Sequence, residues 1–486
     1  MRFPRIVAVL AFAVHLPIAA PYGFFRDELY FIACGRRPAF GYVDQPPLVP
    51  LLAAATQLLG QNLGLLRAVA GLAHAGLVLA VAALAERLEE TKKAAPLAAL
   101  AVLLAPMFLG LHATLNTTVF EPLAWTLFAL FTLRAIHEQP RCWLWAGLVA
   151  GVALEAKYAI PFFAAPLLLG VVLSPRRRAL MTWQALAGAG LAVAIALPSA
   201  LWQATHGLPF LELMHAAKEK NELVPPVAFI LNQLMVMNPL LAPVWLAGIV
   251  YGFLHPKARF LSIAFAGVFA EMLLLHGKDY YVAPAYGVAF ALGAVAVTAW
   301  VPWGAVRGIW FAGAAAFAAV AAPLALPLLP PEQLVKYLAA IHQTPQQQEK
   351  SQRGVALPTE MADMLGWPEL ARTVSTAWQA LPDRADAAIL VTNYGEAGAI
   401  DFFGNGLRAR SGHNQYWLWG QGMPDPKVLL VLGRLERWKP RCGSVEVVGR
   451  AGVPYAMPYE QNRPLLLCRD LYKPLSSLWP DLQSYE

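Results

Sequence analysis

Charged residues are scarce in this chain, and their scarcity excludes a soluble globular protein. Of 486 residues, 14% are charged and 58% are hydrophobic, whereas a soluble domain carries about 25% charged residues. The mean hydropathy is +0.50. The composition therefore predicts a membrane protein. In such a protein, acidic residues near the membrane cost free energy and therefore point to a functional site.

Motifs for zinc and for nucleic acids are also lacking. The four cysteines form no CxxC pair and no Cys/His spacing of the kind that binds zinc. The net charge of +7 is not gathered in a basic patch with interleaved aromatic residues, so we expect no nucleic acid partner. The sequence contains neither an internal repeat nor a low-complexity tail.

Apolar segments dominate the first 329 residues. Eleven of them, of roughly 17–25 residues, are predicted to cross a hydrocarbon core of about 30 Å. The fifth and sixth are short and share one interrupted apolar run, so the boundary between them is the least defined. The expected spans are 5–22, 61–85, 95–111, 118–136, 142–155, 159–173, 181–203, 227–253, 260–276, 281–300 and 308–329.

Basic residues in the connectors indicate the orientation of the spans. All six basic clusters fall on one side if the spans alternate, and the positive-inside rule assigns that side to the cytoplasm. An odd number of spans then places the C-terminus outside. Residues 1–20 resemble a signal peptide, but the ten spans that follow favour an uncleaved first helix. The clusters are Arg2 and Arg5; Lys92 and Lys93; Arg134 and Arg141; Arg176, Arg177 and Arg178; Lys257 and Arg259; and Arg307.

The last third of the chain has a different character. Residues 387–393 and 428–432 are apolar, short and bounded by turn residues, which predicts buried strands. Residues 361–381 have helical spacing. We therefore expect a transmembrane domain at 1–329 and a small α/β domain at 330–486 on the outer face. Cys442 and Cys468 both fall in this domain, where oxidation permits a disulfide, although their pairing stays open.

Ionisable side chains gather in the outward connectors. A transporter would carry its acids at the midplane of the membrane, whereas an enzyme at the membrane surface would hold them at one edge. Carboxylates there can deprotonate a hydroxyl, and Lys, Arg or Tyr side chains can bind a phosphate leaving group. The candidates are Asp27, Glu28 and Asp44 in the first connector; Glu121; Lys157 and Tyr158; and Lys278, Tyr280 and Tyr281.

Each candidate also has a structural interpretation. The acids at 27–28 could cap a helix N-terminus, which favours negative charge, and Asp44 could begin a turn before two prolines. The Lys157 ammonium could reach the lipid headgroups, and the tyrosines at 280–281 could belong to an interfacial aromatic belt. The functional interpretation rests on the coincidence of these groups at one membrane face.

Several of these stretches resemble the protein O-mannosyltransferase and aminoarabinose-transferase superfamily. The acids at 27–28 and the motif GYVDQPPL at 41–48 are similar to the first outer loop of these GT-C fold, polyprenyl-phosphate-sugar-dependent glycosyltransferases. Residues 116–125, 156–158 and 277–286 also resemble bacterial members. In the outer domain, 393–397 and 411–420 look like the C-terminal part of bacterial relatives, without an assigned role.

The resemblance implies a function and a mechanism. The donor is a polyprenyl-phosphate sugar, with undecaprenyl phosphate as the carrier in the inner (plasma) membrane of a bacterium. The transfer is inverting, Asp27 is the catalytic base with Glu28 second, and the active site faces the periplasm. Aminoarabinose-transferase-like members often carry a lysine before the paired prolines, where this chain has Gln45. That departure counts against aminoarabinose transfer but not against glycosyl transfer.

Three hypotheses follow from the sequence. The first is a membrane glycosyltransferase, in which Lys278 and Tyr281 steady the departing phosphate and the acceptor is a lipid, a glycan or a protein. The second is a transporter or flippase of lipid-linked sugars, and the third a non-catalytic assembly or sensor protein that binds through the outer domain. We predict no cofactor, although Asp27, Glu28 and Asp44 leave a divalent metal open.

Overall fold

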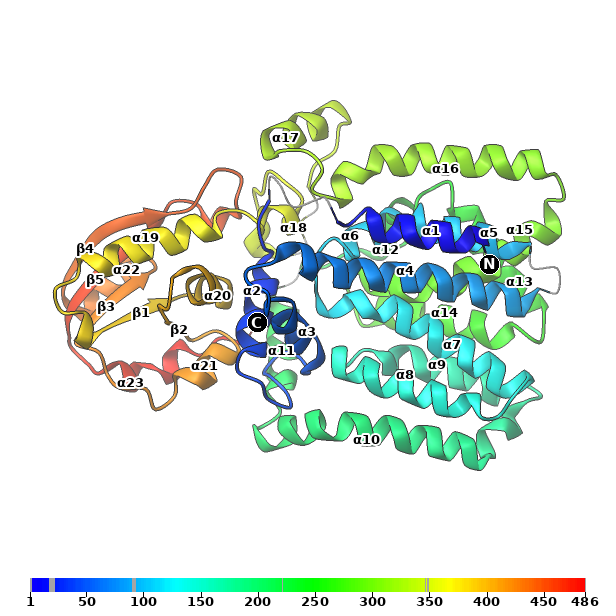
Figure 1. Cartoon of the computed structure of the whole chain (residues 1–486), viewed down its shortest axis with the longest axis horizontal. Coiled ribbons are helices and arrows are strands. Elements are labelled where there is room, and N and C mark those ends of the chain that lie inside the picture. Colours follow the sequence, from blue (N-terminus) through cyan, green and yellow to red (C-terminus); the bar gives the residue numbers. More distant parts are fainter. Residues whose placement is uncertain are drawn as a thin grey trace. The chain divides into compact units, whose positions relative to one another are not determined.

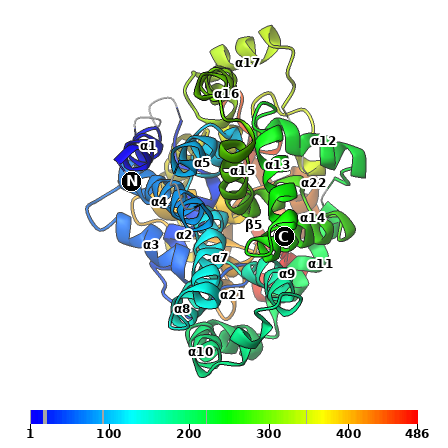
Figure 2. The same cartoon turned by 90° about the vertical axis from the view of Figure 1, so that its right-hand side faces the viewer.

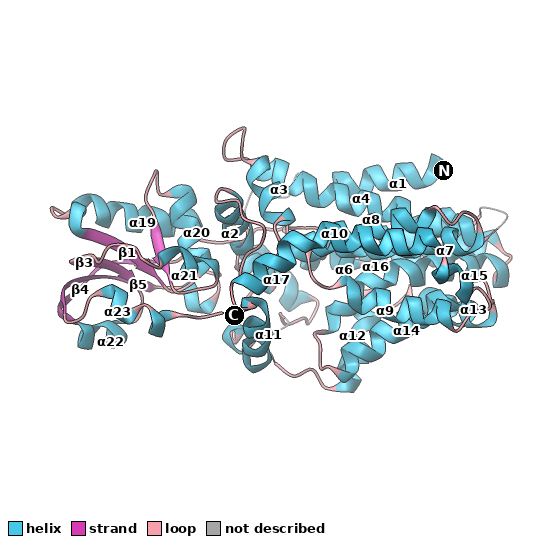
Figure 3. Ribbon diagram, turned by 90° about the horizontal axis from the view of Figure 1, so that it is seen from below, coloured by secondary structure: helices cyan, strands magenta, loops and turns pink. Residues whose placement is uncertain are grey.

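The described chain forms two compact units. The computed structural model describes residues 2–16, 22–89, 93–220, 222–345, 347 and 349–485. A helical unit comprises Met1–Ile18, Gly64–Ala200 and Leu223–Leu328, and a mixed unit comprises Ala19–Leu63, Leu201–Glu222 and Leu329–Glu486. Figure 3 shows that all strands belong to the mixed unit. Each unit is described below by itself.

The helical unit is a bundle of apolar helices around the almost fully buried helix α15, Tyr286–Trp300 (Figures 1 and 2). Glycines allow close helix packing there, because a Cβ on Gly248 of α13 would lie 2.4 Å from the nitrogen of Gly293 in α15. The other elements are α1 Arg2–Ala13, α4 Leu63–Leu88, α5 Ala94–Leu103, α6 Pro106–Leu111, η1 Thr117–Phe120, α7 Glu121–His137, α8 Cys142–Ala156, α9 Ile160–Val172, η2 Arg177–Met181, α10 Trp183–Thr205, α12 Pro226–Val236, α13 Ala242–Leu254, α14 Arg259–Leu274, η3 Asp279–Ala285 and α16 Gly304–Ala325.

These helices confirm the predicted class, a mainly α helical bundle with a small C-terminal sheet. Five described segments are long and apolar enough to cross a membrane, and shorter apolar helices accompany them. Helices α10 and α16 expose apolar side chains along most of their length, as helices that face lipid do. The long segments are Leu63–Leu88, Thr117–His137, Trp183–Thr205, Asp279–Trp300 and Gly304–Ala325.

Two predicted spans are interrupted. The span expected at 227–253 consists of α12 and α13, because the chain turns at Asn238, whose φ is +74°, just before Pro239. The span expected at 95–111 is divided into α5 and α6 by Pro106, which lies at the start of α6. Residues 17–21 of the first expected span, and Lys92 of the second basic cluster, lie outside the described residues.

The mixed unit is built around a five-stranded sheet of order β2-β1-β3-β5-β4. Strand β1 pairs in parallel with β2 and β3, whereas β5 is antiparallel to both β3 and β4. The strands are β1 Ala387–Val391, β2 Ala409–Ser411, β3 Val428–Leu432, β4 Cys442–Ala451 and β5 Arg463–Leu471. The helices are α2 Arg26–Gly35, α3 Leu48–Thr56, α11 Pro209–Lys220, α17 Pro331–Ala340, α18 Thr359–Ala362, α19 Trp367–Ala380, α20 Tyr394–Phe403, α21 Gln415–Gly420, α22 Leu435–Trp438 and α23 Leu475–Leu478, with short 3-10 turns η4 Lys350–Gln352, η5 Arg384–Asp386, η6 Lys439–Arg441, η7 Pro458–Glu460 and η8 Pro480–Leu482.

The sequence predicted parts of this unit correctly. Strands β1 and β3 lie where they were expected, and every residue of β3 is buried. The helix expected at 361–381 is instead two helices, α18 and α19, because Gly366 adopts a φ of +89° between them. The domain boundary at 329–330 stays a prediction, since the mixed unit also contains two of the outward connectors.

A disulfide joins Cys442 of β4 to Cys468 of β5, with 5.8 Å between their Cα atoms. Both side chains are buried in the sheet core. The pairing that the sequence left open is therefore present. The other two cysteines, Cys34 and Cys142, are free thiols and both are buried.

Removal of this disulfide should destabilise the mixed unit. The bond spans 26 residues of sequence, and the chain-entropy relation gives a loss of about 3.5 kcal/mol for a loop of that length. We expect the double variant C442S/C468S to melt at a lower temperature in detergent, whereas Cys142→Ala should cost less. Equal melting temperatures for C442S/C468S and the wild type would contradict the expectation.

Candidate active site

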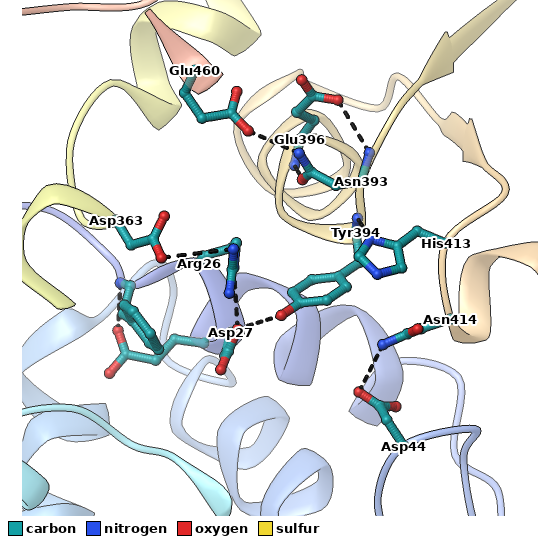
Figure 4. A network of polar contacts seen from close by, with 12 residues as sticks. Arg26, Asp27, Asp44, Asp363, Asn393, Tyr394, Glu396, His413, Asn414 and Glu460 are labelled. Carbon is teal, nitrogen blue, oxygen red and sulfur yellow. Dashed lines mark hydrogen bonds and ion pairs between the residues drawn. The ribbon is translucent and has the colours of Figure 1, made fainter. Parts of the chain in front are cut away.

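Asp27 lies in the first turn of α2, and a tyrosine from the C-terminal part of the chain holds its carboxylate (Figure 4). The hydroxyl of Tyr394 donates to Oδ1 of Asp27 at 2.8 Å, and Nε of Arg26 lies 3.4 Å from the same oxygen. The Asp27 side chain is 28% exposed. No hydrogen bond from the described residues reaches its Oδ2. One oxygen of Asp27 is thus fixed, and the other can accept a proton.

A capping box fixes the start of α20 and with it the position of Tyr394. The Asn393 side chain accepts from the backbone nitrogen of Glu396 at 2.9 Å, and the Glu396 carboxylate accepts from the nitrogen of Asn393 at 3.2 Å. Arg463 pairs with the buried Glu396 at 3.1 Å, and Asn393 donates to Glu460 at 2.8 Å. Tyr394 is therefore the first residue of a helix whose beginning is held on several sides.

Two glycines bring α20 against α2. A Cβ on Gly395 would lie 2.3 Å from Cγ of Arg26, and a Cβ on Gly398 would lie 3.0 Å from the backbone carbon of Leu29. A Cβ at Gly395 would force the Arg26 side chain to move, and a Cβ at Gly398 would be a tight contact. This close approach lets the Tyr394 hydroxyl reach Asp27.

Aromatic rings surround Tyr394 and keep its hydroxyl aimed at Asp27. Its ring stacks on Tyr30 at 4.5 Å and lies 4.7 Å from the ring of His413, while the Arg26 guanidinium lies 5.2 Å from the ring centre. Burial raises the pKa of Tyr394 well above its usual value, and the Asp27 carboxylate raises it further. The phenol therefore stays protonated and acts as a hydrogen-bond donor.

Arg26 links this centre to two other segments of the mixed unit. Its Nη1 donates to the hydroxyl of Tyr459 at 2.7 Å and lies 3.7 Å from Oδ2 of Asp363. Burial raises the pKa of Asp363 to about 6, although the Arg26 charge opposes the shift. Arg26 is thus the cation between two carboxylates, Asp27 and Asp363.

Asp44 links the first outward connector, residues 23–60, to the C-terminal part of the mixed unit. Its Oδ1 accepts from the Tyr30 hydroxyl at 2.8 Å, and its Oδ2 accepts from Asn414 at 3.3 Å. The backbone nitrogen of Gln415 also donates to the Tyr30 oxygen at 3.2 Å. Burial raises the pKa of Asp44 to about 6 against the effect of the Tyr30 hydrogen bond. The contacts of Asp44 are those of a positioning residue.

Glu28, predicted to act beside Asp27, has the contacts of a helix cap. Its Oε2 accepts from the backbone nitrogen of Phe25 at 2.8 Å, and its side chain is fully buried. This is the capping interpretation that the sequence left open for the acids at 27–28. The two neighbouring acids therefore point to different partners.

The residues that meet at Asp27 and Asp44 come from one edge of the sheet. Tyr394 follows the carboxyl end of β1, and His413 and Asn414 follow the carboxyl end of β2, which is parallel to β1. The carboxyl ends of parallel strands are the usual place for ligand sites in α/β proteins. The predicted strand at 387–393 and the following N-x-x-E capping pattern are the sequence signals for Tyr394, which was not among the predicted site residues.

In the helical unit, the structure brings together Glu121, Lys157 and Tyr281. The Lys157 ammonium lies 3.1 Å from Oε2 of Glu121, donates to the Thr118 hydroxyl at 2.8 Å, and lies 5.4 Å from the centre of the Tyr281 ring. Glu121 is the first residue of α7, so the pair stands at the end of a span. Lys157 follows the last residue of α8 and is held in an ion pair.

The short helix η3 carries the remaining cation and aromatic residues of the prediction. Lys278 precedes η3, and Tyr280 and Tyr281 pack edge to face at 4.8 Å. Asp279 holds this segment by accepting from Asn232 at 2.8 Å and from the backbone of Tyr280 at 2.8 Å. Lys278 and Tyr280 are both half-buried, as is Tyr158, which lies next to Lys157.

Metal ligands are not clustered in the described part of the chain. No group of three or more His, Cys, Asp or Glu side chains there is arranged to hold a metal ion. Asp27, Glu28 and Asp44 are instead engaged with Tyr394, Phe25 and Tyr30 respectively.

Asp44 should make the stability of the mixed unit depend on pH. Because its folded pKa is raised to about 6, the folded state binds the proton more tightly, and this stabilisation is present at low pH and lost as the pH rises from about 4 to about 6. We expect the melting temperature of the wild type to fall relative to Asp44→Asn over that interval. Asp363→Asn should flatten the dependence in the same way, and parallel curves for wild type and both variants would contradict the assignment.

Part of the chain matches a known protein family. Residues 44–202 match the family described as dolichyl-phosphate-mannose-protein mannosyltransferase. A search of curated proteins gives no match. Among solved structures, ArnT from Cupriavidus metallidurans in the apo state is 14% identical over 95% of this chain and 96% of its own, with a TM-score of 0.63. The same protein bound to undecaprenyl phosphate gives 13% identity, 96% coverage of both chains and a TM-score of 0.62.

Fold and family match agree with the motifs quoted from the sequence. The likeness to ArnT extends over nearly the whole of both chains, and the family match begins at Asp44, within the motif at 41–48. The chain is thus a multi-pass membrane protein with the GT-C fold, and its resemblance to the superfamily of polyprenyl-phosphate-sugar glycosyltransferases is confirmed.

Proposed function

We propose that this protein is an integral membrane glycosyltransferase that moves a sugar from a polyprenyl-phosphate donor to an extracytoplasmic acceptor with inversion. The observation that carries the proposal is the Asp27 carboxylate, with one oxygen held by Tyr394 and the other without a partner among the described residues. The fold shared with a protein solved with undecaprenyl phosphate supports the same lipid as the carrier here.

Asp27 acts as the general base. As the acceptor hydroxyl attacks the anomeric carbon, its proton passes to Oδ2 of Asp27, and the bond between that carbon and the phosphate oxygen breaks. Tyr394 keeps the carboxylate in one orientation, which matters because a base must lie within hydrogen-bond reach of the proton that it takes. Glu28 serves as the cap of α2, so we assign the base role to Asp27 alone.

The cations of the helical unit stabilise the phosphate that leaves. Lys157 and Tyr281 lie together at the end of α8 and in η3, and Lys278 is three residues before Tyr281. Positive groups that are fixed before the reaction stabilise charge that develops on a leaving group. Glu121 balances Lys157 while no phosphate is bound. Tyr158 and Tyr280 complete this donor site.

The reaction takes place on the periplasmic side of a bacterial inner membrane. Alternation of the spans and the positive-inside rule assign the connectors that carry Asp27, Lys157 and Lys278 to the outer face. The disulfide of the mixed unit supports the same side, because disulfides persist in the periplasm and are rare in the cytosol. The acceptor is a lipid, glycan or protein exposed there.

A flippase is disfavoured by the positions of the acids in the spans. A translocation path through the membrane needs polar groups near its midplane. Glu121 begins α7, and Glu271 lies in the last turn of α14, which ends at Leu274. Both acids are at the ends of their helices, as an enzyme acting at the membrane surface requires.

Asp27→Asn should abolish most of the transfer while leaving the fold intact. Proton transfer by a positioned base contributes about 10²–10⁴-fold, so we expect a loss of turnover in that range, measured as release of polyprenyl phosphate from a labelled donor in detergent. Glu28→Gln is the matched control, because Gln can still accept from the Phe25 nitrogen. Near-normal turnover by Asp27→Asn would remove the mechanism.

Tyr394→Phe should slow catalysis without weakening donor binding. The hydroxyl holds the Asp27 carboxylate in one orientation, and a positioned base contributes about 10²–10⁴-fold, so partial loss of that positioning should lower turnover by roughly tenfold or more. We expect a lower kcat with an unchanged donor KM. Tyr22→Phe is the control, since it removes another tyrosine hydrogen bond of the same unit, to Leu329. Equal kinetics for the two variants would argue against a role for Tyr394.

A further inference from the structure

A groove lies in the helical unit, between α5 and α16. The two helices line a groove of about 630 Å³, which is within the range of about 300–1,000 Å³ of small-molecule sites. Figures 1 and 2 both show α16 at the margin of the helical unit. The groove is independent of the residues assigned above to glycosyl transfer.

One face of each helix contributes to the groove. The α5 side consists of residues spaced three or four apart, as on a single helix face, and the α16 side has the same spacing. Apart from one cation on each side, the lining is apolar or small. The lining residues are Lys93, Pro96, Leu97, Leu100 and Leu104 from the α5 segment, and Gly304, Arg307, Gly308, Phe311, Ala312 and Ala315 from α16.

The groove has one charged end and one closed apolar end. Lys93 and Arg307 both lie near the N-terminal ends of their helices, and no described residue pairs with either side chain. At the other end, the buried Asn238 donates to the carbonyl of Leu104 at 3.0 Å and to that of Ala314 at 2.9 Å. Asn238 therefore closes the groove about where α5 stops.

The length of the groove matches one leaflet of a bilayer. Eleven residues separate Lys93 from Leu104, which corresponds to about 16 Å at a rise of 1.5 Å per residue. Half of a hydrocarbon core is about 15 Å thick. An acyl chain of one leaflet thus fits between the cations and Asn238, and two cations at the membrane surface match an anionic headgroup.

Small residues keep the groove open. An added Cβ at Gly304 or at Gly308 would meet no atom within 4 Å. Ala312 and Ala315 continue this open face of α16 and are both exposed. A larger side chain at Gly308 would therefore enter the groove without displacing the backbone of a neighbouring helix.

We propose that this groove binds an anionic phospholipid of the cytoplasmic leaflet, with its phosphate between Lys93 and Arg307 and one acyl chain along α5 and α16. The positive-inside pattern assigns the end of the groove that carries the two cations to the cytoplasm. The bound lipid fills the space between α16 and α5. Two polar contacts link α16 to its neighbours: Asn238 donates to the Ala314 carbonyl, and the Trp310 indole donates to the Leu240 carbonyl at 2.6 Å.

The test is lipid binding to the full-length protein, measured by native mass spectrometry in detergent. Phosphatidylglycerol should bind tighter than phosphatidylcholine with the same acyl chains. The double variant K93Q/R307Q should lose that preference, with about tenfold or more weaker binding of phosphatidylglycerol, since each cation near an anionic surface contributes about 1 kcal/mol. Retention of the preference by this variant would overturn the proposal.

Substitutions at two glycines, one in the groove and one outside it, test whether lipid occupies the groove. Gly308→Leu should weaken the binding of both lipids by filling the groove, whereas Gly190→Leu, on α10, should not, because an added Cβ at Gly190 also meets no atom within 4 Å. Equal effects of the two substitutions would contradict the site. If Gly308→Leu does not fold, K93Q/R307Q decides alone.

Two further arms locate the lipid and identify it. A phosphatidylglycerol with a photoreactive acyl chain should label peptides that contain Leu97, Leu100 or Phe311, and labelling confined to other helices would overturn the proposal. Unlabelled phosphatidylglycerol should compete better than undecaprenyl phosphate. Stronger competition by undecaprenyl phosphate would identify the occupant as the donor lipid and reject a phospholipid site.

Discussion

The hydrogen bond between Tyr394 and Asp27 is the contact on which the candidate site depends. It joins two segments 367 residues apart in the sequence, and it forms because α20 lies directly against α2 at Gly395 and Gly398. A Cβ at Gly395 would clash with the Arg26 side chain, and a Cβ at Gly398 would press on the backbone of Leu29. The hydrogen bond therefore depends on the close packing of α2 and α20, which brings the two groups together.

The same contact explains why the mixed unit contains more than the C-terminal sheet. The first connector is anchored to the carboxyl edge of β1 and β2 through Asp27 and Asp44. Arg26 adds a link to Asp363 and Tyr459. Apolar side chains of the same connector, among them Leu29, Ile32 and Val43, are also buried, so apolar packing and these polar contacts together fix the connector.

Three acids, Asp27, Asp44 and Asp363, lie in this region, and two of them, Asp27 and Asp363, pair with the Arg26 guanidinium. Burial raises the pKa of Asp44 and of Asp363 to about 6, and the nearby Asp27 raises both further. Each of these two acids has its hydrogen-bond donors from the protein, Tyr30 and Asn414 for Asp44 and Tyr459 for Asp363. Asp27 differs in that its Oδ2 accepts no hydrogen bond from a described residue, which is why we propose Asp27 as the base.

Much of the fold could be predicted from the sequence, because apolar length and the positions of Lys and Arg report directly on spans. The same signals could not reveal the turn at Asn238 or the break at Gly366, since both depend on a positive φ at one residue within an otherwise regular pattern. Strands β4 and β5 were missed because much of β4 is exposed and β5 is only partly buried, so neither forms a continuous apolar run.

The candidate site was predictable only in part, and the reason is physical. Single acids and lysines stand out in an apolar chain, which drew attention to Asp27, Glu121 and Lys157. Tyr158, Tyr280 and Tyr281 were selected because they lie beside lysines in the outward connectors. Tyr394 has no such neighbour in the sequence, and its contact with Asp27 arises only in the fold. Glu28 is as conspicuous as Asp27 in the sequence, and its carboxylate accepts from the Phe25 nitrogen, which is the helix-capping contact that the sequence had left open. In a membrane protein, charge locates a site, and the direction of each side chain decides which of its charges can reach a substrate.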